Sequence, residues 1–369
     1  MLTVDIYPER MIVFTSQVFA GLYDLRNNNE LKIRRGWRGF PSLDPDSVHF
    51  HLVPMRVEDE AGRRVNVVFD LIDGAQIPSA RHLEWSDVYF KASLRPGITA
   101  DDSPKVVPFG LRYACTSGNE SLLDRFLFAL ISGLRGRRSQ VVDSSRLHRM
   151  FSNPIWLALS RFKATEGYSR LPPNVSYFES PPSKGVKTLV YYLTRVYPLD
   201  DAKTPEIAEE FHKVNEVRAN TIRALRDSLV PSFVGGLRPT PFALASYADI
   251  TMQEPWGLRR HLETVKQSAI CVTTHGLFDC IDWKVAEYLA ASKCLVVEKL
   301  LSELPVPLEE GRQIRSFTNP EECVRQCELL LQSPDLLAQS RQEAFDYYQQ
   351  HVAPSSIMRN CLKTALSYG

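Results

Sequence analysis

Short apolar runs alternate with longer amphipathic segments along most of this chain. In the second half, the apolar runs predict strands at residues 188–193, 232–234, 269–272 and 294–297. Helical periodicity predicts helices between and after them, at residues 205–229, 280–292, 319–331, 334–351 and 355–366. Regular alternation of strands and helices is typical of a parallel sheet, so we predict an α/β domain here.

The first half predicts a mixed α/β arrangement. Its apolar runs predict strands at residues 2–6, 48–53, 65–71, 87–91 and 106–108. A helix is expected between residues 11 and 25, and the charged segment EDEAGRR suits a surface turn between two antiparallel strands. No glycine-rich phosphate loop follows the first strand, where the chain reads YPERM. Nucleotide binding is therefore expected in the second half.

The segment LPPNVSYFESPPSKGVK is rich in Pro, Ser and Gly, and we expect the domain boundary there. The length of 369 residues agrees with about two domains of roughly 150 residues each. We predict an N-terminal domain over residues 1–180, a C-terminal domain over 181–353 and a terminal helix over 354–369.

The segment AICVTTHGLFDCIDWKVAEYLAASKCLVVE reads as strand, turn, helix and strand. Ligands of open parallel sheets bind beyond the carboxyl ends of the strands, where helix N-termini also converge. The polar turn with Thr274, His275 and Gly276 lies at such an end. Lys284 and Glu287 share a face of the helix that follows, and that face can hold a phosphate and ribose hydroxyls together.

Other candidate contacts for a nucleotide follow neighbouring strands. Arg195 comes just after the strand TLVYYLT, where a guanidinium can bind a diphosphate, although an ordinary surface arginine is the alternative. Gly235 and Gly236 end another predicted strand. They permit close backbone approach or a positive φ, which a plain turn would also need.

At these residues the chain resembles the C-terminal half of two-domain glycosyltransferases of the GT-B fold. The pattern of that family places an acidic residue, seven others and then a glutamate followed by small residues, and here it reads Asp279 to Glu287, then YLAASK. The similarity continues through LVVEKLLSELPVPLEEGRQIRSFTNPEECVRQCELLL. In the first half, VVFDLIDG and WSDVYFKASLR look like a subset of bacterial surface-polysaccharide transferases.

The resemblance implies two Rossmann-like α/β domains that face a cleft, with the last helix crossing back onto the first domain. It implies transfer of a sugar from a nucleotide-sugar donor to a glycan, lipid-linked or other hydroxyl acceptor, without an obligatory metal or other cofactor. Glu287 would hold the ribose, and Asp279 would lie near the transferred sugar. A sugar-nucleotide epimerase of the same fold and a non-catalytic nucleotide-sugar-binding scaffold are the alternatives, and the stereochemical outcome stays open.

The acceptor side is assigned to the N-terminal domain, again through the resemblance. Asp73, which follows the strand VVFDLI, is the first candidate for the catalytic base, whereas Asp70 lies within the strand and can pair with Lys91 or Arg95. The other acceptor-side candidates are His49 and His51 on one strand face, Asp87 at a strand start and Trp37 among arginines. Each of them also has an ordinary structural interpretation, as a sheet residue, a strand cap or part of an exposed loop.

Charge and cysteine content indicate which binding partners and metal sites are not expected. The chain has 44 Lys and Arg against 43 Asp and Glu, so its charge gives no general attraction to nucleic acid. Seven cysteines, an odd number, indicate buried thiols in a reducing compartment. Cys323 and Cys327 have helical spacing but no second ligand pair nearby, so a zinc site is not expected.

The apolar segments indicate the cellular location of the protein. The N-terminus lacks the pattern of a secretory signal, so a cytoplasmic protein is expected. The apolar stretch at residues 122–134 is too short for a membrane span of about 20 residues. Arg135, Arg137 and Arg138 follow it, which leaves open a peripheral contact with a membrane, beside the simpler role of cations at a helix C-terminus.

Overall fold

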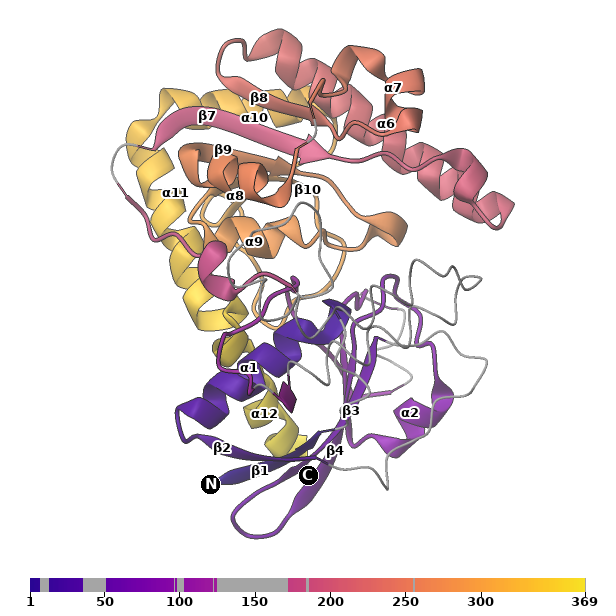
Figure 1. The fold of residues 1–369 in the computed structure, drawn as a ribbon, viewed down its shortest axis with the longest axis vertical. Coiled ribbons are helices and arrows are strands. Elements are labelled where there is room, and N and C mark those ends of the chain that lie inside the picture. The colour runs from indigo at the N-terminus through magenta and orange to yellow at the C-terminus, as the bar shows by residue number, and fades with distance from the viewer. Residues whose placement is uncertain are drawn as a thin grey trace. The chain divides into compact units, whose positions relative to one another are not determined.

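The computed structural model describes residues 1–6, 13–35, 51–95, 97, 103–121, 123–124, 172–183, 186–254 and 256–368. The chain divides into two compact units, shown in Figure 1. Unit 1 comprises Met1–Tyr177 with His351–Gly369, and unit 2 comprises Phe178–Gln350. The predicted boundaries lay after residues 180 and 353, three residues beyond these divisions. The apolar stretch at residues 122–134 lies almost entirely outside the described residues.

Unit 1 contains a six-stranded sheet in the order β2-β1-β3-β4-β5-β6. Its strands are β1 (Leu2–Ile6), β2 (Leu31–Arg35), β3 (Leu52–Glu58), β4 (Arg64–Asp70), β5 (Val88–Lys91) and β6 (Val106–Pro108). β3 runs antiparallel to both of its neighbours, and the other pairs are parallel. The predicted antiparallel pair is confirmed. The sequence did not predict β2, because LKIRR is short and alternates apolar with basic residues.

Helices cover both faces of this sheet. On one face, α1 (Ser16–Asn27) and α12 (Pro354–Tyr368) share an apolar core with β1, β3, β4 and β5. On the other face, α2 (Ala80–Trp85) contributes Leu83 and Trp85 to a smaller cluster with Val68 and Tyr89. The terminal helix therefore belongs to unit 1, as the resemblance implied.

Unit 2 contains a five-stranded sheet in the order β11-β10-β9-β7-β8, and all its pairs are parallel. The strands are β7 (Lys187–Thr194), β8 (Phe233–Leu237), β9 (Ser268–Thr273), β10 (Cys294–Glu298) and β11 (Ile314–Phe317). Counted within the unit, the spatial order is 2-1-3-4-5, so the direction of winding reverses between β7 and β9. Ligands of doubly wound folds bind at such a switch point, beyond the carboxyl ends of the strands. The predicted α/β fold class is confirmed.

The helices of unit 2 pack on both faces of its sheet. α6 (Pro205–Ser228) and α10 (Pro320–Gln332) share a core with Tyr192, while the next residue along β7, Tyr191, bonds to α8 (Leu258–Gln267) on the other face. α9 (Lys284–Ala290) lies on the α8 side, and α7 (Pro241–Ser246) and α11 (Pro334–Tyr347) complete the unit. α9 is shorter than the helix predicted over residues 280–292, because Cys280 is extended and the helix begins only at Lys284.

Capping residues explain where the longest helices begin. The Thr204 hydroxyl accepts a hydrogen bond from the Ile207 amide at the start of α6, and Pro205 occupies the first turn. Asn319 caps α10 in the same way through the Glu322 amide. A side-chain oxygen at this position satisfies one of the unpaired amides of the first turn, so both helix starts could be predicted closely.

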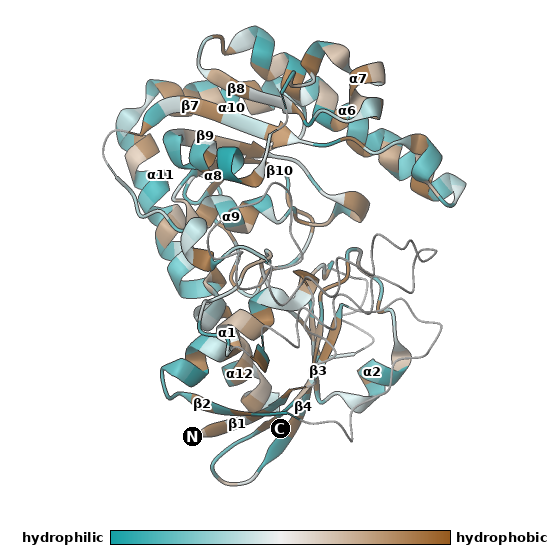
Figure 2. Cartoon of the chain, viewed as in Figure 1, coloured by the Kyte–Doolittle hydropathy of each residue, from teal (hydrophilic) through white to brown (hydrophobic). Residues whose placement is uncertain are grey.

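Hydropathy follows this layering. Figure 2 shows hydrophobic residues along the strands and hydrophilic residues on the outer sides of many helices. Within the described parts of the chain, no helix has both the length and the apolarity needed to cross a membrane.

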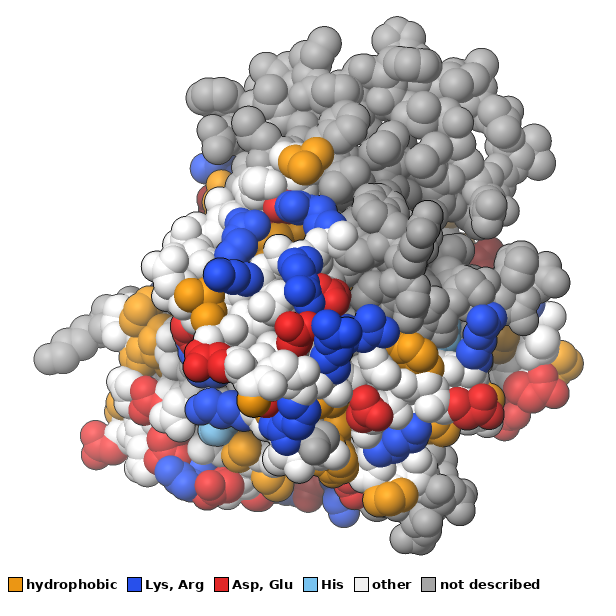
Figure 3. Space-filling view, turned by 90° about the horizontal axis from the view of Figure 1, so that it is seen from below, with side chains coloured by type: hydrophobic (Ala, Val, Ile, Leu, Met, Phe, Trp, Pro, Cys, Tyr) orange, Lys and Arg blue, Asp and Glu red, His pale blue; other side chains and the backbone are white. Residues whose placement is uncertain are grey.

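Charged side chains of both signs share the face seen in Figure 3, where Lys and Arg lie beside Asp and Glu. In unit 1, Arg34 pairs with Asp5 at 2.7 Å and with Glu58 at 3.0 Å. Arg359 of α12 pairs with Glu30 at 2.7 Å. Exposed pairs of this kind contribute about 0–1 kcal/mol each, so the burial of α12 against α1 matters more for its docking.

The variant Gly21→Ala tests how closely α12 packs against α1. A Cβ atom at Gly21 would lie 2.1 Å from the carbonyl oxygen of Pro354, so α1 and α12 approach too closely for any side chain there. Helix propensity alone favours Gly21→Ala by about 1 kcal/mol. We expect the clash to outweigh this and to lower the free energy of unfolding by about 1–3 kcal/mol. Urea denaturation measures the change, and Asn27→Ala at the exposed end of α1 is the control. A Gly21→Ala variant as stable as the wild type would contradict the close packing.

Candidate functional site

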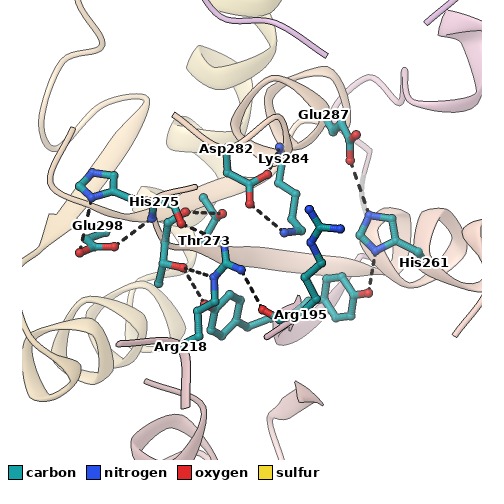
Figure 4. Close-up of polar contacts among 12 residues, drawn as sticks. Arg195, Arg218, His261, Thr273, His275, Asp282, Lys284, Glu287 and Glu298 are labelled. Carbon is teal, nitrogen blue, oxygen red and sulfur yellow. Dashed lines mark hydrogen bonds and ion pairs between the residues drawn. The ribbon is translucent and has the colours of Figure 1, made fainter. Parts of the chain in front are cut away.

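The site lies at the carboxyl edge of the unit 2 sheet, where β7 and β9 diverge. Arg195 follows β7, and Thr274 and His275 follow β9. Lys284 and Glu287 are in the first turn of α9, which returns from the same edge. Figure 4 shows Arg195, His275, Lys284 and Glu287 around this edge, with their polar contacts in separate groups. The residues of these two loops that were predicted to bind the nucleotide-sugar donor therefore come together at the switch point.

Arg218 of α6 joins the two loops. This side chain is 2% exposed, and its guanidinium donates to the carbonyl oxygens of Arg195 at 2.8 Å and His275 at 2.9 Å. Its Nε lies 3.4 Å from the Thr274 hydroxyl, which also bonds to the Tyr192 hydroxyl at 2.9 Å. The planar guanidinium, with five donors in a fixed fork, suits three acceptors on two separate segments. Thr274 is thus part of the internal network that fixes the edge.

His275 and Gly276 shape the turn after β9. The His275 amide donates to Glu298 at 2.9 Å, and Nε2 of its ring lies 2.9 Å from the Lys299 carbonyl oxygen. Because a carbonyl oxygen only accepts, the ring proton is on Nε2. A Cβ atom at Gly276 would lie 2.5 Å from the Cys280 sulfur, so glycine is needed for close approach. The φ of Gly276 is −76°, so the positive φ considered for it is not used.

Lys284 pairs with Asp282 at 2.9 Å, and the Lys284 amide also donates to the same carboxylate at 3.0 Å. Burial alone would raise the pKa of Asp282, but the charges of Lys284 and Arg218 outweigh it and hold that pKa below its usual range. Asp282 therefore stays ionised and offsets the buried charge of Arg218. Lys284 remains near the edge as a cation that is partly neutralised.

Glu287 is 4% exposed and faces His261 of α8, with 3.6 Å between its Oε2 and the histidine Nε2. The other ring nitrogen of His261, Nδ1, lies 2.8 Å from the Tyr191 hydroxyl. In the residues that the structure describes, no donor makes a hydrogen bond to the Glu287 carboxylate. A buried carboxylate with unused acceptor capacity can bind a ligand hydroxyl.

Asp279 lies in the 3-10 turn between β9 and α9. Its carboxylate pairs with Lys213 of α6 at 2.7 Å. Asp279 and Phe278 have φ values of +52° and +56°, a left-handed conformation that residues other than glycine rarely adopt. Such backbone strain is concentrated at ligand-binding turns. The sugar-side role of Asp279 remains a prediction.

The prediction that Gly235 and Gly236 come after their strand is wrong, because both are buried within β8. A Cβ atom at Gly235 would lie 1.9 Å from the Tyr192 carbonyl oxygen, and one at Gly236 would lie 2.5 Å from the Ile250 carbonyl oxygen. Their φ values are +150° and +154°. The glycines are required because neighbouring backbone packs against them on both sides. A role as donor contacts has no support in this packing.

Two arginines stand at the carboxyl ends of β7 and β8. Thr194 and Leu237 are register partners, and the next residues along these strands are Arg195 and Arg238, whose amide donates to Thr194 at 2.8 Å. The Arg195 guanidinium stacks on the Tyr197 ring at 4.8 Å and bonds to its hydroxyl at 3.3 Å. Across the described parts of the chain, neither guanidinium has a carboxylate partner. Both guanidinium groups remain available for an anion.

In unit 1, the carboxyl ends of β4 and β5 carry a second group of charges. Asp70 and Lys91 are fully buried and pair at 3.1 Å, as considered from the sequence, and the Tyr89 hydroxyl donates to Asp70 at 2.9 Å. Burial raises the pKa of Asp70 and lowers that of Lys91, and each partner opposes this shift in the other. This pair is structural.

Asp73, the predicted base, follows β4 and is ion-paired with Arg112. The Arg112 guanidinium is buried and also donates to the Leu71 carbonyl oxygen at 2.5 Å. The Asp73 side chain is 46% exposed, so a fixed carboxylate emerges at the carboxyl edge of this sheet. This placement agrees with an acceptor-side role but does not test it.

The remaining acceptor-side candidates are less well supported. Asp87 lies at the amino end of β5, where its carboxylate accepts from the Asn66 amide at 2.7 Å. Asp73 lies at the opposite edge of the same sheet. The prediction that Asp87 and Asp73 share one site is therefore corrected, and Asp87 instead acts as a strand cap. The His51 ring stacks against Phe14, with 4.2 Å between ring centroids. His49 and Trp37 lie outside the described residues.

The residues of the unit 2 site that were not predicted include Arg218, His261, Arg238 and Asp282. Arg218 stands in the apolar stripe of α6, four residues after Val214 and four before Ile222. His261 is buried on α8 four residues before Val265. A polar residue inside an apolar helix stripe must find a buried partner, and this signal was present in the sequence.

Comparisons with known proteins place the chain only at the level of the fold. No protein-family model matches the sequence. No curated protein matches it. Solved structures that it resembles include glycosyltransferases, as the sequence predicted.

Three of these structures show how distant the likeness is in sequence identity, coverage and TM-score. Anabaena Alr3699/HepE in complex with UDP and glucose is 10% identical, with 98% of this chain and 96% of that chain covered and a TM-score of 0.38. TarM is 9% identical, with 85% and 64% covered and a TM-score of 0.36. The UDP-GlcNAc 2-epimerase from Neisseria meningitidis bound to UDP-GlcNAc is 11% identical, with 79% and 64% covered and a TM-score of 0.36. Likeness at this level assigns no function, so the function is inferred from this chain's own residues.

Arg218→Lys tests the junction of the two loops. Lysine keeps the charge but cannot donate to three separated acceptors at once. Because hydrogen bonds to charged groups contribute about 1.5–3 kcal/mol each, we expect the free energy of unfolding to fall by about 2–3 kcal/mol. Urea denaturation gives the change. Arg223→Lys, an exposed arginine of α6 paired with Asp249, should change it by less than about 1 kcal/mol. Equal effects in the two variants would contradict the role of Arg218.

Proposed function

We propose that this protein binds a nucleotide-sugar donor at the carboxyl edge of the unit 2 sheet and transfers the sugar to a hydroxyl acceptor. One observation supports this most strongly. The switch point of that sheet combines a buried carboxylate with unused acceptor capacity, Glu287, and two arginines without a carboxylate partner in the described residues, Arg195 and Arg238. The two kinds of group correspond to the ribose hydroxyls and the diphosphate of one ligand.

Ribose binding is assigned to Glu287. A ribose presents two neighbouring hydroxyl donors, and an ionised carboxylate accepts both through its two oxygens. Because Glu287 is almost completely buried, water does not compete well for these hydrogen bonds, which supports their strength.

Diphosphate binding is assigned to Arg195 and Arg238. Guanidinium groups form paired hydrogen bonds with phosphate oxygens, and cations at this place stabilise the negative charge that develops on a diphosphate leaving group. In Figure 4 the Arg195 side chain extends toward the space between Lys284 and His261. Lys284 provides additional positive charge there, reduced by Asp282. Under this proposal the protein's own cations do the work that a bound metal would do in other enzymes.

The transfer step needs a base that removes the acceptor proton. Asp73 is the proposed base, since Arg112 holds its carboxylate in place at the carboxyl edge of the unit 1 sheet. Asp279 is proposed to contact the transferred sugar, from a strained turn tied to Lys213. The acceptor is proposed to be a glycan or a lipid-linked saccharide. UDP and UDP-sugars are the first donors to test, because they are named with several of the structures that this chain resembles.

Glu287→Ala tests donor binding. Removal of the carboxylate should weaken binding of the nucleotide about tenfold or more, because a hydrogen bond to a charged group contributes about 1.5–3 kcal/mol. Isothermal titration calorimetry with UDP and the other common nucleoside diphosphates measures the affinity. Glu263→Ala, an exposed glutamate of α8, is the control and should bind like the wild type. Unchanged affinity in Glu287→Ala would refute the ribose assignment.

Asp73→Asn tests the transfer step. An amide keeps the shape of the side chain but cannot take up the acceptor proton, so turnover should fall about 10²–10⁴-fold while donor affinity stays nearly constant. The matched control is Asp87→Asn, at the opposite edge of the sheet.

Product analysis with the donor alone separates the alternatives: conversion of the sugar nucleotide without an acceptor indicates an epimerase, and binding without consumption indicates a scaffold.

A further inference from the structure

We infer that His261 is a positioning residue, which orients the Glu287 carboxylate toward the ribose hydroxyls, and that Tyr191 fixes the histidine tautomer needed for this. The inference rests on the proposed function, because ribose binding by Glu287 is itself proposed above. It adds two residues from outside the predicted site, one on α8 and one on β7.

The three side chains form a continuous buried row. The Tyr191 hydroxyl lies 2.8 Å from His261 Nδ1, and His261 Nε2 lies 3.6 Å from Glu287 Oε2. His261 is 3% exposed and Glu287 is 4% exposed, and the Tyr191 side chain is fully buried. Figure 4 shows the His261 ring facing the Glu287 carboxylate. The separation of 3.6 Å is longer than a hydrogen bond, so the histidine acts on the carboxylate through its charge distribution and leaves both carboxylate oxygens able to accept from a ligand.

Tyr191 and Glu287 together decide which nitrogen of His261 carries the proton, because the carboxylate only accepts whereas the hydroxyl can donate or accept. Burial raises the pKa of the Tyr191 hydroxyl well above its usual value, so the hydroxyl stays protonated and can donate to Nδ1. Neutral histidine then has its proton on Nε2, the nitrogen that faces Glu287. The N–H dipole points at the carboxylate and stabilises its charge. The same logic operates where an outer partner fixes the tautomer of a histidine that binds a metal.

Aromatic packing holds the histidine ring in this plane. The centroid of the His261 ring lies 5.6 Å from that of Tyr191 and 6.4 Å from that of Tyr288. Trp256 stacks on Tyr191 at 6.3 Å, and the Arg260 guanidinium lies over the Trp256 ring at 4.1 Å. A ring held by neighbours on two elements, β7 and α9, keeps its direction when the carboxylate binds or releases a ligand. This rigidity is what a positioning residue supplies.

Ribose selectivity provides a readout that loss of fold alone does not change. Calorimetry on the full chain compares UDP, GDP, CDP and ADP with their 2′,3′-dideoxy counterparts. The wild type should bind the ribose form of its preferred nucleotide about tenfold more tightly, or more, than the form without ribose hydroxyls. Glu287→Ala should remove this selectivity. His261→Leu should reduce it to about twofold or less, and Tyr191→Phe should reduce it partly.

Two further variants complete the test. His261→Gln should recover part of the selectivity lost in His261→Leu, because an amide can still donate toward Glu287. His212→Leu, on the exposed side of α6, should bind like the wild type. Thermal unfolding of each variant checks that it is folded, and Tyr191→Phe carries the test if His261→Leu does not fold.

The outcomes separate the inference from the proposed function. If Glu287→Ala removes the selectivity while His261→Leu and Tyr191→Phe retain it, the positioning role is wrong and the proposed function stands. If His261→Leu weakens both forms equally, its role is structural and the inference is also wrong. If no nucleoside diphosphate binds the wild type, or Glu287→Ala retains the selectivity, the proposed function fails and the inference fails with it.

Discussion

The buried guanidinium of Arg218 is the constraint on which the unit 2 site depends. It reaches from α6 to the backbone after β7 and after β9, so the two loops that diverge at the switch point are held by one rigid, charged group. A charge with so little exposure is stable in the folded protein only when acceptors surround it. Asp282 contributes the compensating negative charge from the turn before α9. The backbone positions of Arg195 and His275 therefore depend on a single side chain.

Charge compensation distinguishes structural groups from candidate ligand-binding groups in this protein. Arg218 in unit 2, and Asp70 and Lys91 in unit 1, are buried and balanced by opposite charge, which for Arg218 comes from the partly buried Asp282. Arg195 and Arg238 are different, because neither guanidinium meets a carboxylate in the described chain. The carboxylate of Glu287 likewise faces only a histidine there. Uncompensated groups of both signs at one sheet edge are what a ligand with hydroxyls and phosphates would complete.

The sequence predicted the elements of unit 2 well and the contacts of its site only in part. Apolar runs, capping residues and prolines define the strands and helix starts locally, so β7, β9, β10 and α6 are within a few residues of the prediction. The turn at Thr274 to Gly276 was found because strand ends are local features. Arg218 and His261 were missed because their partners lie 57 and 26 residues away, and such pairs depend on how helices pack. Gly235 was misread because only the register of β8 against β7 shows that backbone leaves no room for a side chain.

The central claim is that the carboxyl edge of the unit 2 sheet binds a nucleotide sugar, and a thermal-shift series tests it most directly. The purified protein is heated with UDP-, GDP-, dTDP-, CMP- or ADP-linked sugars at rising concentrations. A ligand that binds only the folded state raises stability by about 2.7 kcal/mol at a hundred times its Kd. We predict that one nucleotide class raises Tm in a concentration-dependent way and that Glu287→Ala shifts this response to higher concentrations. The absence of any shift at millimolar concentrations would contradict the account.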